Sequence, residues 1–249
     1  MKRFVRGMSL LALTAVLASC KTQLQHTISK EQYYSIDSTL LADTAIVNYY
    51  LPYKGKLEAE MNRVIGHADV ALTKSRDPES LVGNFFADAL LWKGQQLDPA
   101  VQVSFATKGG IRSELKAGDI SVGNIFELMP FENAVTIVTL SGKDMLRWAD
   151  FMAKTSGQPA SGIQLLIEDG QVKEFLVQGK SIDPHATYKL VTYDYLANGG
   201  DYVTFLDQVI DRKDYTQRVR ETLMEYVSTL TKQGKHIQAE IDGRVRINK

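Results

Sequence analysis

Two glycine-rich breaks in the sequence carry side chains suited to binding a flat, anionic ligand. At the first, a predicted buried strand ends before Gly109-Gly110, and Arg112 follows directly. We expect the glycines to adopt positive φ and to let a ligand come close. The guanidinium offers a fixed fork of donors for phosphate or carboxylate. Further along the chain, Pro130 presents an aromatic ring, Phe131, close to an amide, Asn133.

The second break has the same character. A predicted strand leads to Tyr195, then to Gly199-Gly200 and Asp201. We hypothesise that the two breaks face each other and that Phe131 and Tyr195 stack on the two faces of a base. Such stacking contributes about 1–3 kcal/mol per ring.

The remaining polar side chains would then read the rest of the ligand. Asn133 could form paired hydrogen bonds to a base edge, Asp201 could accept from ribose hydroxyls, and Arg112 could bind a phosphate. Each residue also has an ordinary interpretation. Aromatic rings are usually buried in a core, an aspartate after two glycines is common in turns, and a single arginine is commonly a surface charge.

The elements that must position these residues are an intermixed series of strands and helices. The expected strands are 65–73, 101–106, 163–167, 172–177 and 188–193, with 243–247 as an edge strand. The expected helices are a short one and a second one within 39–63, separated at Pro52 and Gly55, then 77–94, 141–157 and a late helix containing Val219, Leu223, Tyr226, Val227 and Leu230. Asp77 is expected to cap the 77–94 helix.

Strands mixed with helices, together with a hairpin signal at Asp169-Gly170, predict an α+β fold with a mixed β-sheet and flanking helices. The chain has 249 residues, 44% of them hydrophobic and 23% charged, which is ordinary globular composition. The formal net charge is zero, so no basic field predicts nucleic-acid binding.

The first residues have the pattern of a bacterial lipoprotein signal peptide. Residues 1–20 combine a basic start with an apolar stretch that ends in Leu17-Ala18-Ser19-Cys20. Lipidation of Cys20 would anchor the protein to a membrane of the bacterial cell envelope, on its periplasmic or surface side. An ordinary signal peptide with a chance cysteine is the alternative. Residues 21–38 are predicted to be a tether, and residues 39–249 to form one domain. Because Cys20 is the only cysteine, we expect neither a disulfide nor cysteine catalysis.

From about residue 39 to 207 the chain resembles the C-terminal, substrate-binding domain of the 5'-nucleotidase and UDP-sugar hydrolase family. The resemblance is carried, in order and spacing, by the segments 76–84, 109–112, 129–133 and 195–201. It implies the fold of that domain and a role for six residues. Phe131 and Tyr195 would sandwich the base, Asn133 would read it, Asp201 would bind ribose, and Arg76 and Arg112 would hold ribose and phosphate.

The sequence departs from the family at two points in this pocket. Tyr195 stands where phenylalanine is also common, a change that leaves stacking intact, and the first glycine break differs. Members usually have Asn-Gly-Gly-Gly-Ile-Arg, whereas here Thr107 and Lys108 precede Gly109. The missing amide could weaken base or ribose contacts, and Lys108 would add bulk and charge beside the pocket.

The metal-binding half of the family's chemistry is not found in the sequence. Family members hydrolyse phosphate esters with two metal ions, held by Asp-x-His, Gly-Asn-His-Asp and further histidines. This chain has four histidines, His26, His67, His185 and His236, and none stands in such a motif. His67 and Asp69 come nearest, but one histidine and one aspartate cannot complete a dimetal centre. We therefore expect no catalytic residue, metal or cofactor in this chain, and divalent metals in a partner.

These observations predict the nucleotide- or nucleoside-binding subunit of a split 5'-nucleotidase. The chain would position base and ribose for a separate metallophosphatase chain, and would be inactive alone. Two alternatives remain open. One is a non-catalytic nucleoside-binding envelope lipoprotein, and the other is a relic fold that no longer binds nucleotides.

Overall fold

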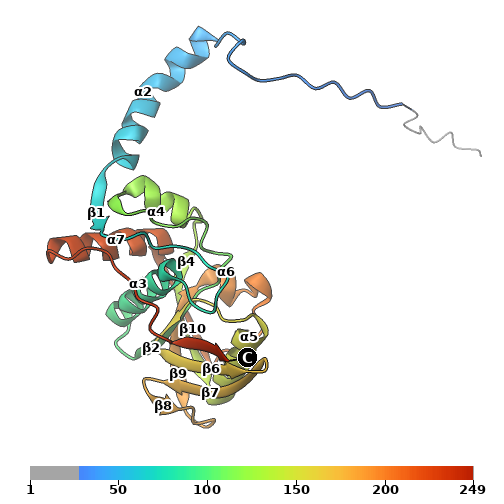
Figure 1. Ribbon diagram of the computed structural model, residues 1–249, viewed down its shortest axis with the longest axis vertical. Coiled ribbons are helices and arrows are strands. Elements are labelled where there is room, and N and C mark those ends of the chain that lie inside the picture. Colours follow the sequence, from blue (N-terminus) through green and yellow to red (C-terminus); the bar gives the residue numbers. More distant parts are fainter. Residues whose placement is uncertain (1–27, 249) are drawn as a thin grey trace, which may run out of the picture. The chain divides into compact units, whose positions relative to one another are not determined.

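The computed structural model describes residues 28–248 (Figure 1). The predicted signal segment and Cys20 lie outside these residues. The described part of the chain divides into two units between Tyr49 and Tyr50. Every helix within 28–248 is too short or too polar to cross a bilayer.

Helix α2 (Thr44–Met61) corrects the expectation of two short helices, because it continues through Pro52 without ending. A proline inside a helix removes one hydrogen bond and crowds the preceding turn. None of the side chains of α2 is buried. Water can therefore satisfy the carbonyl that Pro52 leaves unpaired.

Three sheets organise the rest of the chain. The five-stranded sheet has the order β10-β4-β9-β2-β5 and consists of β2 (Val101–Phe105), β4 (Ala134–Ser141), β5 (Ala160–Ser161), β9 (Thr187–Tyr193) and β10 (Asp211–Arg218). The four-stranded sheet has the order β11-β6-β7-β8 and consists of β6 (Ile163–Glu168), β7 (Gln171–Val177), β8 (Lys180–Ser181) and β11 (Val245–Asn248). The two-stranded sheet pairs β1 (Val64–Ala68) with β3 (Gly118–Ser121).

Parallel and antiparallel pairing occur in the same sheet. Strand β9 runs antiparallel to β4 and parallel to β2. The β6–β7 hairpin turns at Asp169 and Gly170, whose φ values are 50° and 73°, as the two primed turn positions require. Together with the helices, these pairings confirm the predicted α+β class and mixed sheet.

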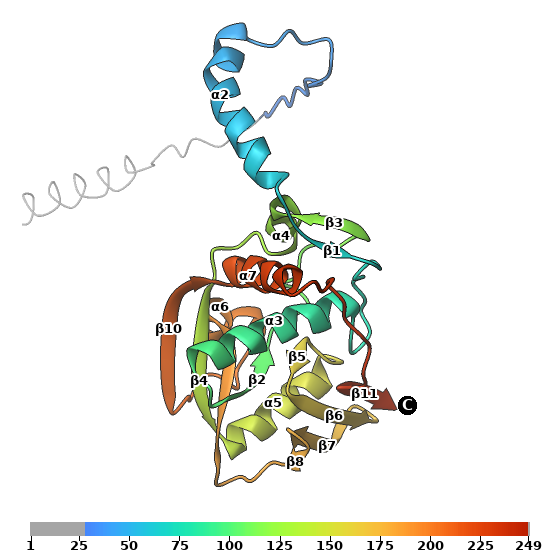
Figure 2. The same ribbon diagram turned by 90° about the vertical axis from the view of Figure 1, so that its left-hand side faces the viewer.

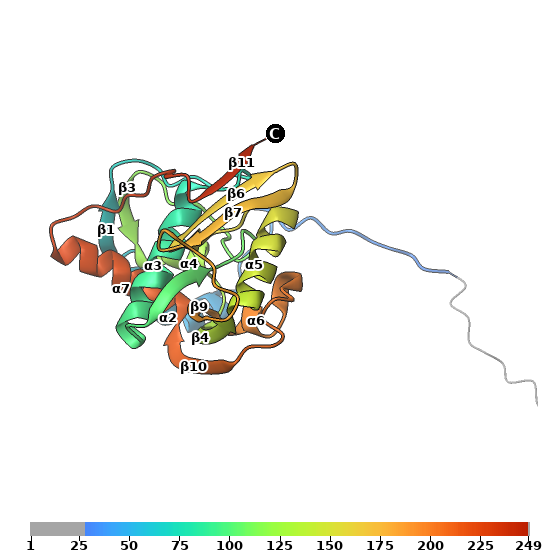
Figure 3. The ribbon, with the colours of Figure 1, turned by 90° about the horizontal axis from the view of Figure 1, so that it is seen from below.

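The helices cover the sheets (Figures 2 and 3). Helix α3 (Leu81–Leu97) packs against β2, β5 and α7 (Val219–Lys232), while α5 (Gly142–Lys154) packs against β7 and β4. The shorter elements are α4 (Val122–Leu128), α6 (Asp194–Ala197) and the 3-10 helix η1 (Gly200–Tyr202).

Two predicted boundaries near α3 are wrong. The strand that starts near Ile65 ends at Ala68 instead of Thr73, because the chain turns and Leu72 pairs instead with Leu115. Helix α3 is capped by Ser80, which accepts from the backbone N–H of Gly83, and not by Asp77. The predicted buried face of this helix, from Val82 to Ala89, is confirmed.

An aromatic cluster fills the core between α5 and the sheets. Trp148 is fully buried and packs against Phe105, Phe175 and Phe205, with ring centroids 5.7–5.9 Å apart. Phe105 is the last residue of β2, directly before the loop that carries Gly109. The cluster therefore fixes the end of the strand from which the first glycine break departs.

Replacing Trp148 by alanine should lower the free energy of unfolding by about 3–5 kcal/mol, because it leaves a large cavity. The matched control is Leu146→Ala on the same helix. Leu146 is 42% exposed, so its loss should change stability by about 0.5 kcal/mol or less. Urea denaturation measures both, and equal effects would contradict the packing described here.

Candidate functional site

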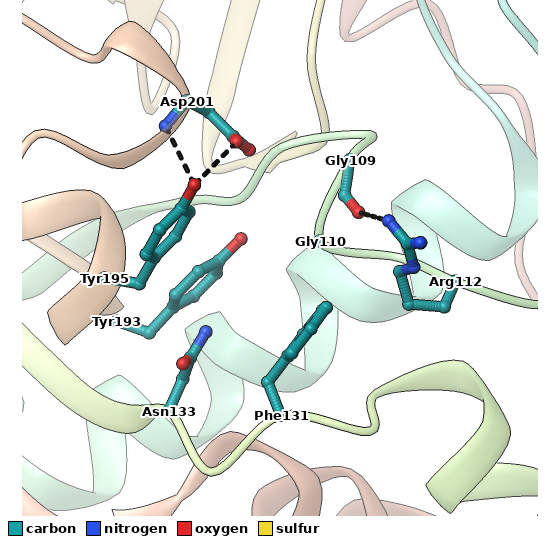
Figure 4. Close-up of a pocket in the computed structure, with 8 residues that line it drawn as sticks. All are labelled: Gly109, Gly110, Arg112, Phe131, Asn133, Tyr193, Tyr195 and Asp201. Carbon is teal, nitrogen blue, oxygen red and sulfur yellow. Dashed lines mark hydrogen bonds between the residues drawn. The ribbon is translucent and has the colours of Figure 1, made fainter. Parts of the chain in front are cut away.

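A cavity of about 270 Å³ lies where β2, β4 and β9 meet at one edge of the five-stranded sheet (Figure 4). Because β2 and β9 are parallel and β4 is antiparallel to them, the ends of the first two and the start of the third share this edge. The lining residues are Gly109, Gly110, Arg112, Phe131, Asn133, Tyr193, Tyr195 and Asp201. Five of the six predicted ligand-binding residues are therefore brought together; Arg76 is the exception.

The two predicted stacking rings belong to the cavity wall and not to the core. Phe131 is 39% exposed and Tyr195 is 47% exposed. Figure 4 shows them entering the cavity from separate segments, Phe131 ahead of β4 and Tyr195 in α6. The guanidinium of Arg112 lies 5.8 Å from the Phe131 ring centroid, within cation–π range. Both rings are thus partly exposed within the cavity, where a flat ligand can reach them.

The side-chain amide of Asn133 lines this cavity and can hydrogen-bond a ligand. Its backbone carbonyl accepts from the N–H of Val219 at 2.9 Å, which fixes the main chain. Its side chain makes no hydrogen bond to any residue within 28–248. The side chain can therefore offer a ligand both a donor and an acceptor.

Two hydroxyls hold the carboxylate of Asp201. Thr107 Oγ1 donates to Oδ2 at 2.5 Å, and Tyr195 OH donates to Oδ1 at 3.1 Å. The Asp201 backbone has φ 51°, a left-handed conformation uncommon for residues other than glycine. Each carboxylate oxygen can accept a further hydrogen bond. The carboxylate is thus oriented before any ligand arrives and can still accept from ligand hydroxyls.

Thr107 and Tyr193 are site residues that the sequence analysis did not recognise. The family pattern marks Thr107 only as a departure, yet it is buried and orients Asp201. Tyr193, the last residue of β9, is fully buried with its OH 3.3 Å from Thr107 Oγ1. Burial raises the pKa of Tyr193 to about 12, so its phenol stays protonated. In the sequence, only its place at the end of a predicted strand, two residues before Tyr195, indicates that Tyr193 could belong to the site.

Gly109 and Gly110 allow the loop to pack closely against neighbouring side chains and do not adopt a positive φ. This corrects the prediction of positive φ. Neither Gly109 nor Gly110 has a positive φ. A Cβ on Gly110 would lie 2.4 Å from the Tyr193 hydroxyl, far inside contact distance. A Cβ on Gly109 would lie 3.3 Å from Asp201 Oδ2. The backbone of this loop therefore packs directly against the tyrosine and the aspartate.

Arg76 and Lys108 lie outside the cavity lining. The ammonium of Lys108 donates to the backbone carbonyls of Arg76, at 3.1 Å, and of Ser156, at 3.2 Å. Burial lowers the pKa of Lys108. These contacts tether the lysine to the neighbouring loops. A ligand role for Arg76 remains a prediction.

Two arginines hold the segment that presents Phe131, and no local sequence pattern indicates this role. Arg220 forms an ion pair with Glu132, donates to the Phe131 carbonyl at 3.2 Å and lies 4.0 Å from the Phe126 ring centroid. Arg218 donates to the Glu132 carbonyl at 2.5 Å. The hydrogen bond from Arg220 holds the pKa of Glu132 below its usual value. Arg218, the last residue of β10, and Arg220, in the first turn of α7, thus fix the loop from which the Phe131 ring projects.

Comparison with known proteins agrees with this geometry. The family model described as "5'-nucleotidase, C-terminal domain" matches residues 64–208. That range contains all eight residues that line the cavity.

Similar proteins are longer than this chain. Protein UshA of Escherichia coli is 27% identical over 170 residues, which cover 65% of this chain and 30% of UshA. Apyrase of Tabanus yao is 28% identical over 247 residues, which cover 85% of this chain and 43% of the apyrase. The crystal structure of a 5'-nucleotidase precursor from Thermus thermophilus superposes with a TM-score of 0.70 at 28% identity, covering 82% of this chain and 43% of that one. The chain thus spans less than half the length of these relatives.

Gly110→Ala should lower the free energy of unfolding by about 1–3 kcal/mol, because the added methyl group overlaps the Tyr193 hydroxyl. In a Tyr193→Phe background the next neighbours are Thr107 atoms at 3.4–3.5 Å, which is ordinary contact. The same glycine change should then cost less than half as much. Chemical denaturation of the four proteins in this cycle measures the difference. An equal cost in both backgrounds would contradict the close approach.

Proposed function

The chain belongs to the 5'-nucleotidase C-terminal domain family, and on that premise we propose that its cavity binds a nucleoside or nucleotide. One observation carries the proposal. Two partly exposed rings, Phe131 and Tyr195, line one cavity. The same cavity is lined by the amide of Asn133, the carboxylate of Asp201 and the guanidinium of Arg112. A nucleotide can use all of these groups at once, because its base stacks on rings, its ribose donates to a carboxylate and its phosphate binds a guanidinium.

Each group has a role in this proposal. The base stacks between Phe131 and Tyr195, and Asn133 hydrogen-bonds its edge. The ribose hydroxyls donate to Asp201, which Thr107 and Tyr195 have already oriented. Arg112, exposed beside Phe131, binds the phosphate. Arg76, from a neighbouring loop, contributes to ribose or phosphate binding.

Catalysis in this proposal requires a separate metallophosphatase chain. The family's hydrolysis uses two metal ions, and none of the four histidines here stands in a dimetal motif. The present chain would bring the nucleotide to a partner that supplies the metals and an activated water. Correct positioning alone can lower a reaction barrier by several kcal/mol, so dividing binding and chemistry between two chains is physically reasonable.

The same proposal places the protein at the cell envelope. The lipobox at 17–20 would lead to acylation of Cys20. Two or more acyl chains give stable membrane association without a membrane-spanning helix. The nucleotide-binding domain would then act on nucleotides outside the cytoplasm.

Phe131→Ala should weaken adenosine binding about tenfold or more, because it removes one of two stacking surfaces worth about 1–3 kcal/mol each. The matched control is Tyr202→Asn, which removes a ring that is 92% exposed and outside the cavity lining. Asparagine tolerates the positive φ of that position. Isothermal titration measures both affinities. Unchanged affinity for the Phe131 variant, with an intact fold, would reject the sandwich.

The split-enzyme part of the proposal predicts complementation. Mixing this protein with a metallophosphatase chain from the same organism should release phosphate from AMP, whereas neither chain does so alone. The Asp201→Asn variant should bind the partner but give much less activity, since its amide no longer offers two acceptor oxygens. Tight nucleoside binding with no activity in any pairing would favour the non-catalytic binding lipoprotein instead.

A further inference from the structure

A second cluster of chemically capable side chains lies away from the nucleotide cavity. His67 is on β1, Asp69 follows that strand, Asp119 is on β3, and His236 follows α7. None of the four lines the cavity. Figures 2 and 3 both show β1 and β3 beside the end of α7. His67, Asp119 and His236 also line a separate surface hollow of about 330 Å³.

The backbone places these four residues side by side. His67 stands directly opposite Asp119 in the antiparallel β1–β3 ladder. The N–H of Ile237 donates to the carbonyl of His67 at 2.7 Å, next to a parallel bridge between Ala68 and Ile237. Three segments that are distant in sequence are therefore joined by main-chain hydrogen bonds, and the cluster does not depend on side-chain contacts alone.

Asp119 sets the orientation of the His67 ring. His67 Nδ1 lies 2.9 Å from Asp119 Oδ1. A ring nitrogen this close to a carboxylate carries the proton and donates it. In the neutral ring, Nε2 then holds a free lone pair. This carboxylate–imidazole arrangement is the one that orients histidine ligands in metalloproteins.

The free Nε2 of His67 lies near two further atoms that can bind a metal, one from Asp69 and one from His236. His67 Nε2 lies 3.9 Å from Asp69 Oδ1, and His236 Nδ1 lies 2.7 Å from the same oxygen, to which it donates in the metal-free protein. A metal ion would replace the proton on His236 Nδ1, because a ligating ring nitrogen must be deprotonated. One ligand atom from each of His67, Asp69 and His236 lies within 4.8 Å of the others. A zinc ion with bonds of about 2.0–2.2 Å separates its ligands by roughly 3.3–3.6 Å. Small side-chain rotations would therefore bring all three donors onto one ion.

We propose that His67 Nε2, His236 Nδ1 and the Asp69 carboxylate bind a single divalent transition metal of the zinc type, with Asp119 positioning His67. Two imidazoles and one carboxylate suit zinc, nickel or copper rather than magnesium or calcium, which prefer oxygen ligands. The three ligating side chains are 42–68% exposed. A fourth coordination position is therefore open to water or to a group from a partner.

A bound ion would link two segments of the domain that are distant in sequence. Its ligands come from both ends of the folded domain, β1 near the start and the segment after α7 near the end. An ion that binds only the folded arrangement stabilises it by mass action. It is one ion at one surface, distinct from the dimetal chemistry assigned to a partner chain.

The test is a calorimetric titration of the full-length chain with zinc alone. Cys20→Ser is included in every protein to remove the only thiol. We expect one zinc ion per chain and a melting temperature that rises with zinc. His67→Ala and His236→Ala should each weaken binding at least about tenfold, and Asp119→Asn about 10- to 100-fold. His185→Ala is the matched control, because His185 is exposed and outside the cluster; it should bind zinc as the parent does.

A spectroscopic readout on the unsubstituted cluster keeps the result independent of folding defects in the variants. Imidazole ¹⁵N spectra should show His67 protonated at Nδ1 before and after zinc is added, with only its Nε2 signal shifted by the metal. No stoichiometric zinc binding, or binding that survives both His67→Ala and His236→Ala, would overturn the proposal. Adenosine titration of the His236→Ala protein separates this test from the nucleotide site, whose binding should be unchanged.

Discussion

The pairing of β4 and β2 with the central strand β9 is the constraint on which the site depends. Val135 pairs with Tyr193 at one end of the β4–β9 ladder, and β2 runs parallel on the other side of β9. This arrangement alone brings the loop after β2, the Phe131 segment before β4 and the Tyr195 turn after β9 to one edge. A slip of one residue in β9 would reverse the faces of its side chains and take Tyr193 away from Gly110.

Once the strands are paired, close contacts hold the groups that line the cavity in place. Gly110 leaves room for the Tyr193 hydroxyl, Thr107 and Tyr195 hold Asp201, and Arg220 braces the loop of Phe131. These contacts order the polar groups before binding, so a ligand would lose less free energy to their immobilisation. The rings stay accessible because the loops, and not the hydrophobic core, present them.

Local sequence signals predicted the elements that local chemistry determines. The 3.6-residue spacing of apolar side chains indicated the buried faces of α3 and α5, and Asp169-Gly170 indicated the hairpin. The signals failed where distant contacts decide. Strands β4 and β10 were not assigned, and the roles of Thr107 and Arg220 depend on partners far away in the sequence. The five site residues lie together as the hypothesis of two facing glycine breaks predicts, and the resemblance to the family implies the same grouping.

In the proposed binding mode, Phe131 and Tyr195 enclose a base. Its most direct test is an NMR measurement of intermolecular nuclear Overhauser effects between bound adenosine and the two rings, in metal-free protein. We expect effects from the adenine protons to both Phe131 and Tyr195, with ribose protons near Asp201. Saturable binding with contacts to neither ring, or to only one of them, would contradict it, as would the absence of binding to adenosine, AMP and UDP-glucose alike.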